Sequence, residues 1–500
     1  MSNQDIVGKL WNLCNVLKDD GITYHQYVTE LTYLLFLKMA DETAQAEHLP
    51  EGCRWSDLMA QSPAQRLEFY KVTLIHLGGH GTALVKEIFA NAASFIKKAG
   101  TLSKLLEDID KLDWYSARNE GLGDVYEGLL EKNANEKKSG AGQYFTPRVL
   151  IDSMVRLMQP QLNDRIQDPA AGTGGFLIAA HHYLKGHHDL DALSAAQQRK
   201  LRRATFFGIE HVQDTHRLAL MNLMLHGIDS STDEGFDSGG VYYGDTLGPE
   251  GEALAKAGAT LILTNPPFGT KKGGGLPART DFEFETSNKQ FCFLQHIYRA
   301  LKPGGRAAVV LPDNVLFENN IGAQIRRDLM EKCNLHTILR LPTGIFYAQG
   351  VKTNVLFFTR AKTAKDNTKS VWVYDLRSNM PIFGKRTQLG REHFAEFEAL
   401  FGDDPCGGPK ALAARQSQTE QGRWRAFSRE WISGRNDNLD ISWLKDDGDR
   451  GEHDHPEPSA LMREALGELE AALEDLRDII VELGEDPELE LVAQREEIDT

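Results

Sequence analysis

Apolar residues recur along this chain with two different spacings, and the change between them divides it. Up to about residue 138 the spacing is helical, as in ELTYLLFLKMADETAQAE, with stops such as HLGGHG. From about 145 to 375, helical stretches alternate with short apolar runs: DRIQD, TFFGIE, GVYYGD, ATLILTN, RAAVVLP, LHTILRLP and VLFFTR. This alternation is typical of a parallel, doubly wound α/β sheet with helices on both faces. We therefore expect an all-α domain over residues 1–138 and an α/β domain over 139–445.

A third pattern occupies the C-terminus. Seven apolar residues recur at steps of four and three, which is the a/d seam of an amphipathic helix. A helix of this kind, following the polar stretch DDGDRGEHDHPEP, docks more often on a partner helix than on its own domain, so we expect residues 456–500 to serve subunit association. The role of the preceding stretch GRNDNLDISWL, residues 434–444, does not follow from its pattern. The seam consists of Met462, Leu466, Leu469, Leu473, Leu476, Ile480 and Leu483.

The net charge of the chain lies almost entirely in this tail. The formal net charge is −16, and residues 451–500 hold 17 Asp or Glu against three Arg, a net of −14. The other 450 residues are nearly neutral, with basic spots at Lys137–Lys138 and Lys271–Lys272 and with Arg279 and Lys289 nearby. Bulk charge therefore does not exclude a nucleic-acid partner.

Several classes of protein are disfavoured. The polar N-terminus lacks a secretory pattern, and no apolar stretch approaches the ~18 residues that cross a bilayer, so we expect a cytoplasmic protein without membrane contact. The five cysteines are widely spaced and are interpreted as reduced, mostly core residues. Histidines at 181–182, 187–188 and 453–455 lack partners at metal-ligand spacing, so we expect solvated helix ends and no metal. The chain has no GxxxxGK[ST] motif, so ATP-driven steps would belong to another subunit.

The residues that end the expected strands should lie together, because ligands of such sheets bind beyond the carboxyl ends of the strands. The first strand ends in DPAAGTGGF, where Asp168 supplies a carboxylate. Gly172, Gly174 and Gly175 would let the backbone approach a ligand at a helix N-terminus. This turn alone is common to many nucleotide-binding proteins and can also be simple turn chemistry.

Carboxylates end the next two strands. Glu210 could accept both ribose hydroxyls of an adenosine, or it could be a solvated carboxylate. Asp245 could accept a hydrogen bond from an adenine amino group. These features would also suit a nicotinamide enzyme.

The tetrapeptide NPPF, residues 265–268, ends the fourth strand and separates the two interpretations. An exocyclic amino group on adenine is a poor nucleophile, because its lone pair is delocalised into the ring. If the Asn265 side-chain oxygen and the Pro266 carbonyl each accept one N–H, the lone pair is drawn toward a methyl sulfonium. Pro267 stiffens the loop, and Phe268 offers a face on which an extruded base can stack. The alternative is that Asn265 caps a turn and Phe268 is a core residue.

This ordered set resembles the N6-adenine DNA methyltransferases in which the cofactor motifs precede the catalytic one, and more closely the modification subunit of type I restriction-modification systems. The resemblance covers most of the chain and implies a methyltransferase fold of the Rossmann-like type, with LKPGGRAAVVLP and VKTNVLFF on its later strands and the second of these reversed. It implies NPPF as the catalytic peptide, Glu210 as the ribose-binding acid and Asp245 near the cofactor adenine. The remaining cofactor contacts that it implies are Gln143, Tyr144, Phe145, Thr146, Pro147 and Arg148 of GQYFTPR, and Thr173, Gly174 and Gly175 of AGTGG.

The resemblance also implies S-adenosylmethionine as methyl donor and duplex DNA as substrate. Only about ninety residues separate VLFFTR from the tail, which is short for a target-recognition domain. We therefore expect sequence specificity on a separate specificity subunit, in a complex with an ATP-dependent restriction subunit and a second copy of this chain. A cytosine-N4 methyltransferase, which more often has Ser at the position of Asn265, and a non-catalytic cofactor-binding scaffold are the alternatives.

Overall fold

The computed structural model describes residues 3–13, 24–42, 49–112, 114, 128, 146–228, 239–269, 276–346, 351–381, 383 and 387–444. Its N-terminal part is helical, as the spacing of apolar residues predicts. These helices bury a core of their own around Leu34, Leu74 and Leu105. They are α1 (Asn3–Asn12), α3 (Tyr24–Glu42), α4 (Trp55–Ala60), α5 (Arg66–Gly79), α6 (Ala83–Ile88) and α7 (Ala99–Asp110).

In the described residues, nine strands form one sheet in the order β3-β2-β1-β4-β5-β7-β6-β8-β9. The seven strands expected from the sequence are present, and β8 and β9 are additional. The bounds are β1 (Ile166–Asp168), β2 (Phe206–Glu210), β3 (Gly240–Tyr243), β4 (Ala259–Thr264), β5 (Leu301–Pro312), β6 (Cys333–Arg340), β7 (Thr353–Arg360), β8 (Ser370–Asp375) and β9 (Trp424–Ser428).

The sheet is mixed. The alternation of strands and helices predicted parallel strands, and β7 departs from this, as does β9, which was not expected. β7 runs antiparallel to both β5 and β6, and β9 runs antiparallel to β8. β6 and β7 are consecutive in the chain, are joined by residues 341–352 and pair directly with each other, so they form an antiparallel hairpin. This reversal is the one that the resemblance implied for VKTNVLFF.

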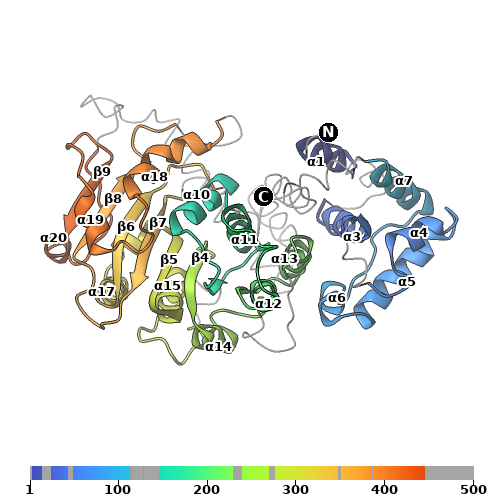
Figure 1. The fold of residues 1–500 in the computed structure, drawn as a ribbon, viewed down its shortest axis with the longest axis horizontal. Helices are drawn as coiled ribbons and strands as arrows, with labels where there is room; N and C mark the ends of the chain where they lie inside the picture. The colour runs from blue at the N-terminus through green and yellow to red at the C-terminus, as the bar shows by residue number, and fades with distance from the viewer. Residues whose placement is uncertain are drawn as a thin grey trace, which may run out of the picture.

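Helices cover both faces of the sheet (Figure 1). One face packs against α10 (Arg148–Met158), α11 (Gly175–His187), α12 (Ala195–Arg203) and α18 (Ala395–Phe401). The other packs against α14 (Pro249–Ala257), α15 (Lys289–Ala300), α16 (Asn314–Phe317), α17 (Ile321–Lys332) and α20 (Arg429–Ser433). Two further short helices, η5 (Arg391–Phe394) and α19 (Pro409–Ala414), connect β8 to β9.

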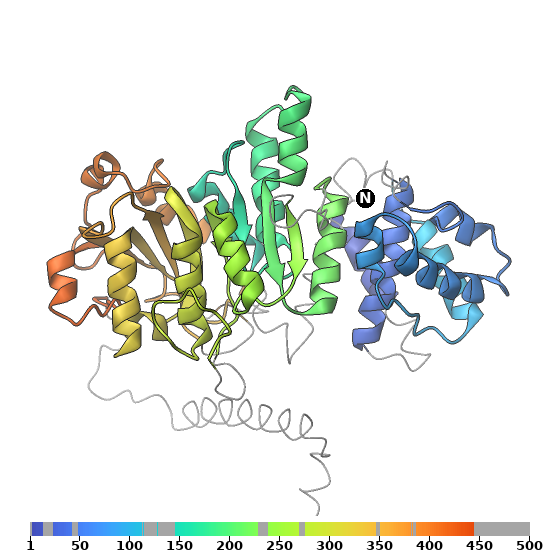
Figure 2. The same ribbon diagram turned by 90° about the horizontal axis from the view of Figure 1, so that it is seen from below.

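Helix α13 (Gln213–Leu225) joins the helical region to the sheet. Ala219 and Leu223, four residues apart, face the core of the sheet. Leu220 and Met224 form a second stripe, which packs into the core of the N-terminal helices. The N-terminal helices therefore lie beside α13, at the end of the molecule far from β9 (Figures 1 and 2).

Segment 434–444 crosses from α20 back to the helices on the second face of the sheet. Leu439 and Ile441 are buried in that core, and the Leu439 N–H donates to the Leu316 carbonyl at 2.9 Å. Asp437 is buried, and its carboxylate accepts from Arg327 at 2.8 Å and Arg429 at 2.6 Å. Residues 434–444 thus form a structural strap that links α17, through Arg327, to the start of α20, through Arg429.

Candidate active site

The carboxyl ends of β1 and β4 are neighbours at the point where the strand order changes direction. β1 pairs in parallel with β2 on one side and with β4 on the other. Asp168 ends β1, and Asn265 directly follows β4. In open α/β sheets this switch point is where ligands bind, so the sheet topology brings the two sequence motifs to one crevice.

The glycine turn after β1 has an unusual backbone conformation and leaves open space beside it. Gly172 and Gly174 have φ of +55° and +84°, which L side chains rarely adopt. A Cβ added to Gly172 would meet nothing within 4 Å, so the space beside this residue is open. Gly175 begins α11, whose N-terminus therefore points at the same space.

Glu210 lies against this turn and is not simply a solvated carboxylate. Its Oε2 accepts from the Gly172 N–H at 2.9 Å, and its Oε1 accepts from the Val212 N–H at 2.8 Å. Burial raises the pKa of Glu210, while these backbone hydrogen bonds oppose the shift. The carboxylate is thereby fixed at the end of β2 beside Val212, an apolar side chain that is 46% exposed.

Asp168 is buried at the carboxyl end of β1. Its Oδ1 accepts from the Ala170 N–H at 3.0 Å, which shapes the start of the glycine turn. Burial raises the pKa of Asp168 to about 7, and the nearby charge of Glu210 adds to this effect. A Cβ on Gly208 would lie 2.2 Å from the Asp168 carbonyl oxygen, so only glycine lets β2 approach β1 this closely.

The loop after β3 is tied to the same turn. Asp245 Oδ1 accepts from the Leu247 N–H at 2.8 Å, so this side chain shapes its own loop, and its contact with an adenine stays a prediction. The Thr246 hydroxyl donates to the Pro169 carbonyl, and Arg279 Nη1 donates to the Thr246 carbonyl at 2.7 Å. The loops after β1 and β3 are therefore fixed to each other.

Arg279 is a structural residue, and its expected contribution to a basic surface spot is wrong. Its side chain is fully buried and forms two hydrogen bonds of 2.7 Å with Asp281. It also contacts Nδ1 of the buried His296 at 3.1 Å. The basic spots at 137–138 and 271–272 lie outside the described residues.

The NPPF peptide is held at both ends. Asn265 Nδ2 donates to Thr146 Oγ1 at 2.9 Å, across 119 residues of sequence. At the other end, the Gly269 carbonyl accepts from the Lys289 N–H at the start of α15 at 3.3 Å. Pro266 is buried and Pro267 is exposed. The peptide therefore leads from the core of the sheet to the surface, and hydrogen bonds hold it at both ends.

Phe268 is half-buried and lies edge-on to Phe346, with ring centroids 6.2 Å apart and an interplanar angle of 74°. It packs at the border of the core on one face of the sheet. Phe346, the aromatic neighbour of Phe268, was not expected from the sequence. It lies in the connection after β6, and this connection has no recognisable motif.

Of the expected cofactor peptide, Gln143, Tyr144 and Phe145 lie outside the described residues. Thr146 contacts Asn265 as above. Pro147 caps the N-terminus of α10, and Arg148 lies 3.3 Å from Asp152 in an ion pair of the same helix.

Asn222 supports the glycine turn and was also missed. Its Nδ2 donates to the Thr173 carbonyl at 3.0 Å from within α13. A lone Asn in the apolar run LALMNLML was the signal that could have found it, because a buried amide needs a polar partner.

The other expectations have mixed outcomes. Cys53, Cys292 and Cys333 are buried free thiols, as expected, and Cys406 is half-buried. His181 is not a solvated helix end: burial lowers its pKa to about 3, and its ring lies edge-on to Phe206. In the part of the chain that the structure describes, no three His, Cys, Asp or Glu side chains could hold a metal ion.

The membrane expectation can be examined only for helices with described residues. None of them is both long enough and apolar enough to span a bilayer.

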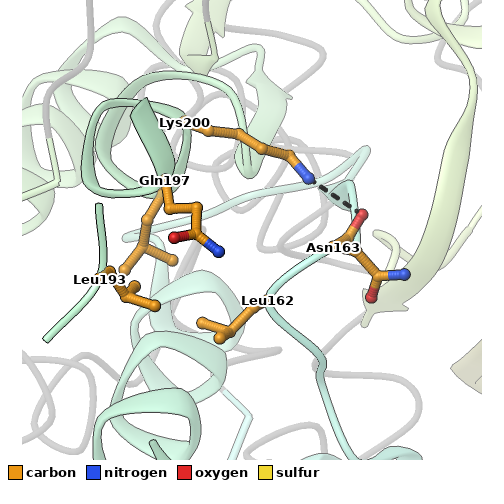
Figure 3. Close-up of a pocket in the computed structure, with 6 residues that line it drawn as sticks. Leu162, Asn163, Leu193, Gln197 and Lys200 are labelled. Atoms are coloured by element: carbon orange, nitrogen blue, oxygen red, sulfur yellow. Dashed lines mark hydrogen bonds between the residues drawn. The ribbon is translucent and has the colours of Figure 1, made fainter. Parts of the chain in front are cut away.

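A shallow pocket of about 130 Å³ lies at the opposite edge of the sheet, before β1 and β2 (Figure 3). Leu162, Leu193 and Leu201 form its apolar side, and Lys200 Nζ donates to the Asn163 carbonyl at 3.3 Å across it. Ligand sites usually enclose ~300 to 1,000 Å³, so this pocket is too small for a nucleotide.

Known proteins are similar to this chain in sequence and in fold. Residues 117–445 match the family model described as N-6 DNA Methylase, and residues 6–109 match the HsdM N-terminal domain. The methylase subunit of the type I restriction enzyme EcoKI from Escherichia coli strain K12 is 50% identical, over 99% of this chain and 98% of that protein.

Two solved structures are similar over nearly the whole chain. The crystal structure of the EcoKI M protein matches with a TM-score of 0.57 and 45% identity, covering 98% of each chain. A structure from a study of complex assembly in the type I R-M system matches with a TM-score of 0.71 and 25% identity, covering 97% of this chain and 99% of that one.

Proposed function

Because the chain belongs to the N-6 DNA methylase family, as the methylase subunit of a type I restriction enzyme, we propose that its crevice binds S-adenosylmethionine beside Asn265. The observation that carries this proposal is the position of Asn265 next to the glycine turn, at the switch point between β1 and β4. The family's methyl transfer to N6 of adenine needs a site for the methyl donor beside groups that accept the adenine N–H bonds, and the glycine turn and Asn265 follow neighbouring strands at this edge.

The residues present fit the donor. The open space beside Gly172, the N-terminus of α11 and the carboxylate of Glu210 suit a ligand with ribose hydroxyls. The half-exposed Val212 offers an apolar surface to its adenine. When bound, S-adenosylmethionine supplies a methyl group activated by a sulfonium. We propose that Gln143 to Arg148, Asp168, Thr173 to Gly175, Glu210 and Asp245 form its site.

Asn265 and Pro266 provide the chemistry on the substrate side. The Asn265 side-chain oxygen and the Pro266 carbonyl accept the two N–H groups of the adenine, which localises the nitrogen lone pair. Both acceptors are preorganised, because Asn265 is tied to Thr146 and Pro266 is buried. The edge-on contact of Phe268 and Phe346 provides an aromatic wall for an extruded base.

We propose duplex DNA as the substrate and a separate subunit as the source of sequence specificity. The described residues after β7 form β8, β9, their short helices and the strap over 434–444, all of which belong to the same fold. We therefore also propose association through residues 456–500, within a complex that includes a restriction subunit and a second copy of this chain. The cytoplasm is the proposed location, where the duplex DNA substrate would be met.

We also propose that the chain is divided into three parts: an N-terminal helical domain over residues 1–138, the catalytic domain over 139–445 and the association tail over 456–500.

Product analysis tests this function. The chain, copurified with its specificity subunit, would be given duplex DNA and isotopically labelled S-adenosylmethionine, and the nucleosides would be identified by mass spectrometry. We expect the label in N6-methyladenine. Label in N4-methylcytosine would support the cytosine alternative, and bound donor without labelled DNA would support a scaffold.

A further inference from the structure

We propose that Thr146 is a positioning residue, whose hydroxyl sets the orientation of the Asn265 carboxamide. The inference rests on the proposed role of Asn265 and extends it to a residue that the resemblance implied only for cofactor binding. It stands on one contact, the 2.9 Å hydrogen bond from Asn265 Nδ2 to Thr146 Oγ1.

The orientation of this carboxamide decides whether it can act. The oxygen and nitrogen of an Asn side chain have nearly the same shape, and a half-turn exchanges an acceptor for a donor. A nitrogen turned toward the adenine would place N–H against N–H and remove one of the two acceptors. In the structure Thr146 accepts from the nitrogen, so within the plane of the carboxamide the oxygen points away from Thr146.

Both partners are attached to rigid elements, so the hydrogen bond joins two fixed points. Thr146 precedes Pro147, whose carbonyl accepts from the Leu150 N–H at 3.0 Å in the first turn of α10. Leu150 is buried in the core of the sheet. Asn265 directly follows Thr264, a fully buried residue that ends β4. A hydrogen bond between two residues on rigid elements can fix the position and orientation of a side chain with the precision that catalysis needs.

Three variants distinguish the effect of the Thr146 hydroxyl from the effect of side-chain shape. Thr146→Val removes the hydroxyl and keeps the shape, whereas Thr146→Ser keeps the hydroxyl. Thr205→Val is the matched control, because Thr205 is buried and its hydroxyl donates to the Lys200 carbonyl at the opposite edge of the sheet. The copurified complex would be assayed for kcat, KM for DNA and, by calorimetry, affinity for S-adenosylmethionine.

We expect Thr146→Val to lower kcat by ~10- to 100-fold, as a small misplacement of a reacting group does. The loss of turnover should be larger than any loss of affinity for S-adenosylmethionine, because Thr146 also lies in the proposed cofactor site. Thr146→Ser should restore most of the turnover, and Thr205→Val should behave as wild type. In an Asn265→Ala background, Thr146→Val should cost nothing further, because the side chain that it orients is gone.

Three results would overturn the inference: wild-type kcat in Thr146→Val, equal losses in the Val and Ser variants, or the same loss with and without Asn265. A fall in cofactor affinity that matches the fall in turnover would assign the hydroxyl to the cofactor instead. Failure of the proposed function looks different, because Asn265→Ala would then itself keep wild-type turnover.

Discussion

Single polar residues at strand ends form the proposed site, because each of them follows an apolar strand that ends at the same edge of the sheet. Their partners were not predictable. Thr146 reaches Asn265 across 119 residues, and Asn222 reaches Thr173 across 49. Only the folded chain brings such pairs together, and the sequence carries no local signal for their distance.

The proposed role of Glu210 can be measured directly. Glu210→Ala removes the acceptor for the ribose hydroxyls and should weaken S-adenosylmethionine binding by ~1 to 3 kcal/mol, or roughly 5- to 150-fold. Glu210→Gln, which keeps one acceptor oxygen and the shape, should lose less. Calorimetry measures both affinities, and circular dichroism checks that the fold is kept. Unchanged affinity in the Ala variant would remove Glu210 from the cofactor site.

Asp168 should make stability depend on pH near neutrality. Its folded pKa of about 7 lies above the ordinary value, so between about pH 4 and 7 the folded protein holds a proton that the unfolded chain has released. Stability from this group is therefore fully present below about pH 4 and declines as pH rises from about 4 to 7, by at most ~1.4 kcal/mol per pH unit.

The isosteric variant Asp168→Asn isolates this effect. Because the carboxamide that replaces the carboxyl group cannot ionise, the melting temperature of the variant relative to wild type should rise from about pH 5 to 7 and then level off. Thermal unfolding across this range measures the difference. A constant difference at every pH would show that Asp168 does not titrate there.

At the scale of whole elements, the strands that carry the site were predicted and the elements beyond it were not. β1 to β7 correspond to the apolar runs named from the sequence. β8 contains a further apolar run, VWVY, which was not counted as a strand, and β9 is interrupted by Arg425. The strap over 434–444 has too few apolar residues for a period, and its place depends on the distant partners of Asp437. Its alternation of buried and exposed positions appears only once Leu439 and Ile441 are packed.

Asp437 should be the most sensitive polar position of the strap. Asp437→Ala would remove hydrogen bonds to Arg327 and Arg429, and it would place alanine, which has no polar side chain to bond locally, at a φ of +56°. We expect the free energy of unfolding to fall by ~2 kcal/mol. This is less than for a fully buried ion pair, because the Arg327 side chain is 53% exposed.

Asp437→Asn is the matched control, since Asn tolerates the left-handed conformation and keeps part of the hydrogen bonding. It should lose less than the Ala variant in chemical denaturation. If Asp437→Ala is as stable as wild type, the strap does not depend on this residue.

At the scale of the whole molecule, two associations matter: the N-terminal helices on α13, and the proposed docking of the tail. The first is visible as the two apolar stripes of α13. The second lies outside the described residues and depends on the seam from Met462 to Leu483. Because all the proposed cofactor and catalytic residues lie between 143 and 268, the tail should be dispensable for the site itself.

Deletion of residues 456–500 should therefore leave S-adenosylmethionine binding intact and abolish stable association with the specificity subunit. Copurification and calorimetry measure the two properties separately. A point substitution sharpens the test: Leu473→Asp lies on the seam, and Ala471→Asp lies off it. Full association of the Leu473→Asp variant would show that the seam does not bind the partner, and lost cofactor binding after deletion would show that the tail belongs to the catalytic fold.

The central claim is that Asn265 acts on the adenine amino group and not on the cofactor. Single-turnover methyl transfer by the complex carrying Asn265→Ala, measured beside its affinity for S-adenosylmethionine, tests this most directly. Removing one preorganised acceptor should cost ~3 kcal/mol or more in the transition state, a loss of at least ~100-fold in rate, while the affinity stays near that of wild type. Methyl transfer at the wild-type rate would contradict the account.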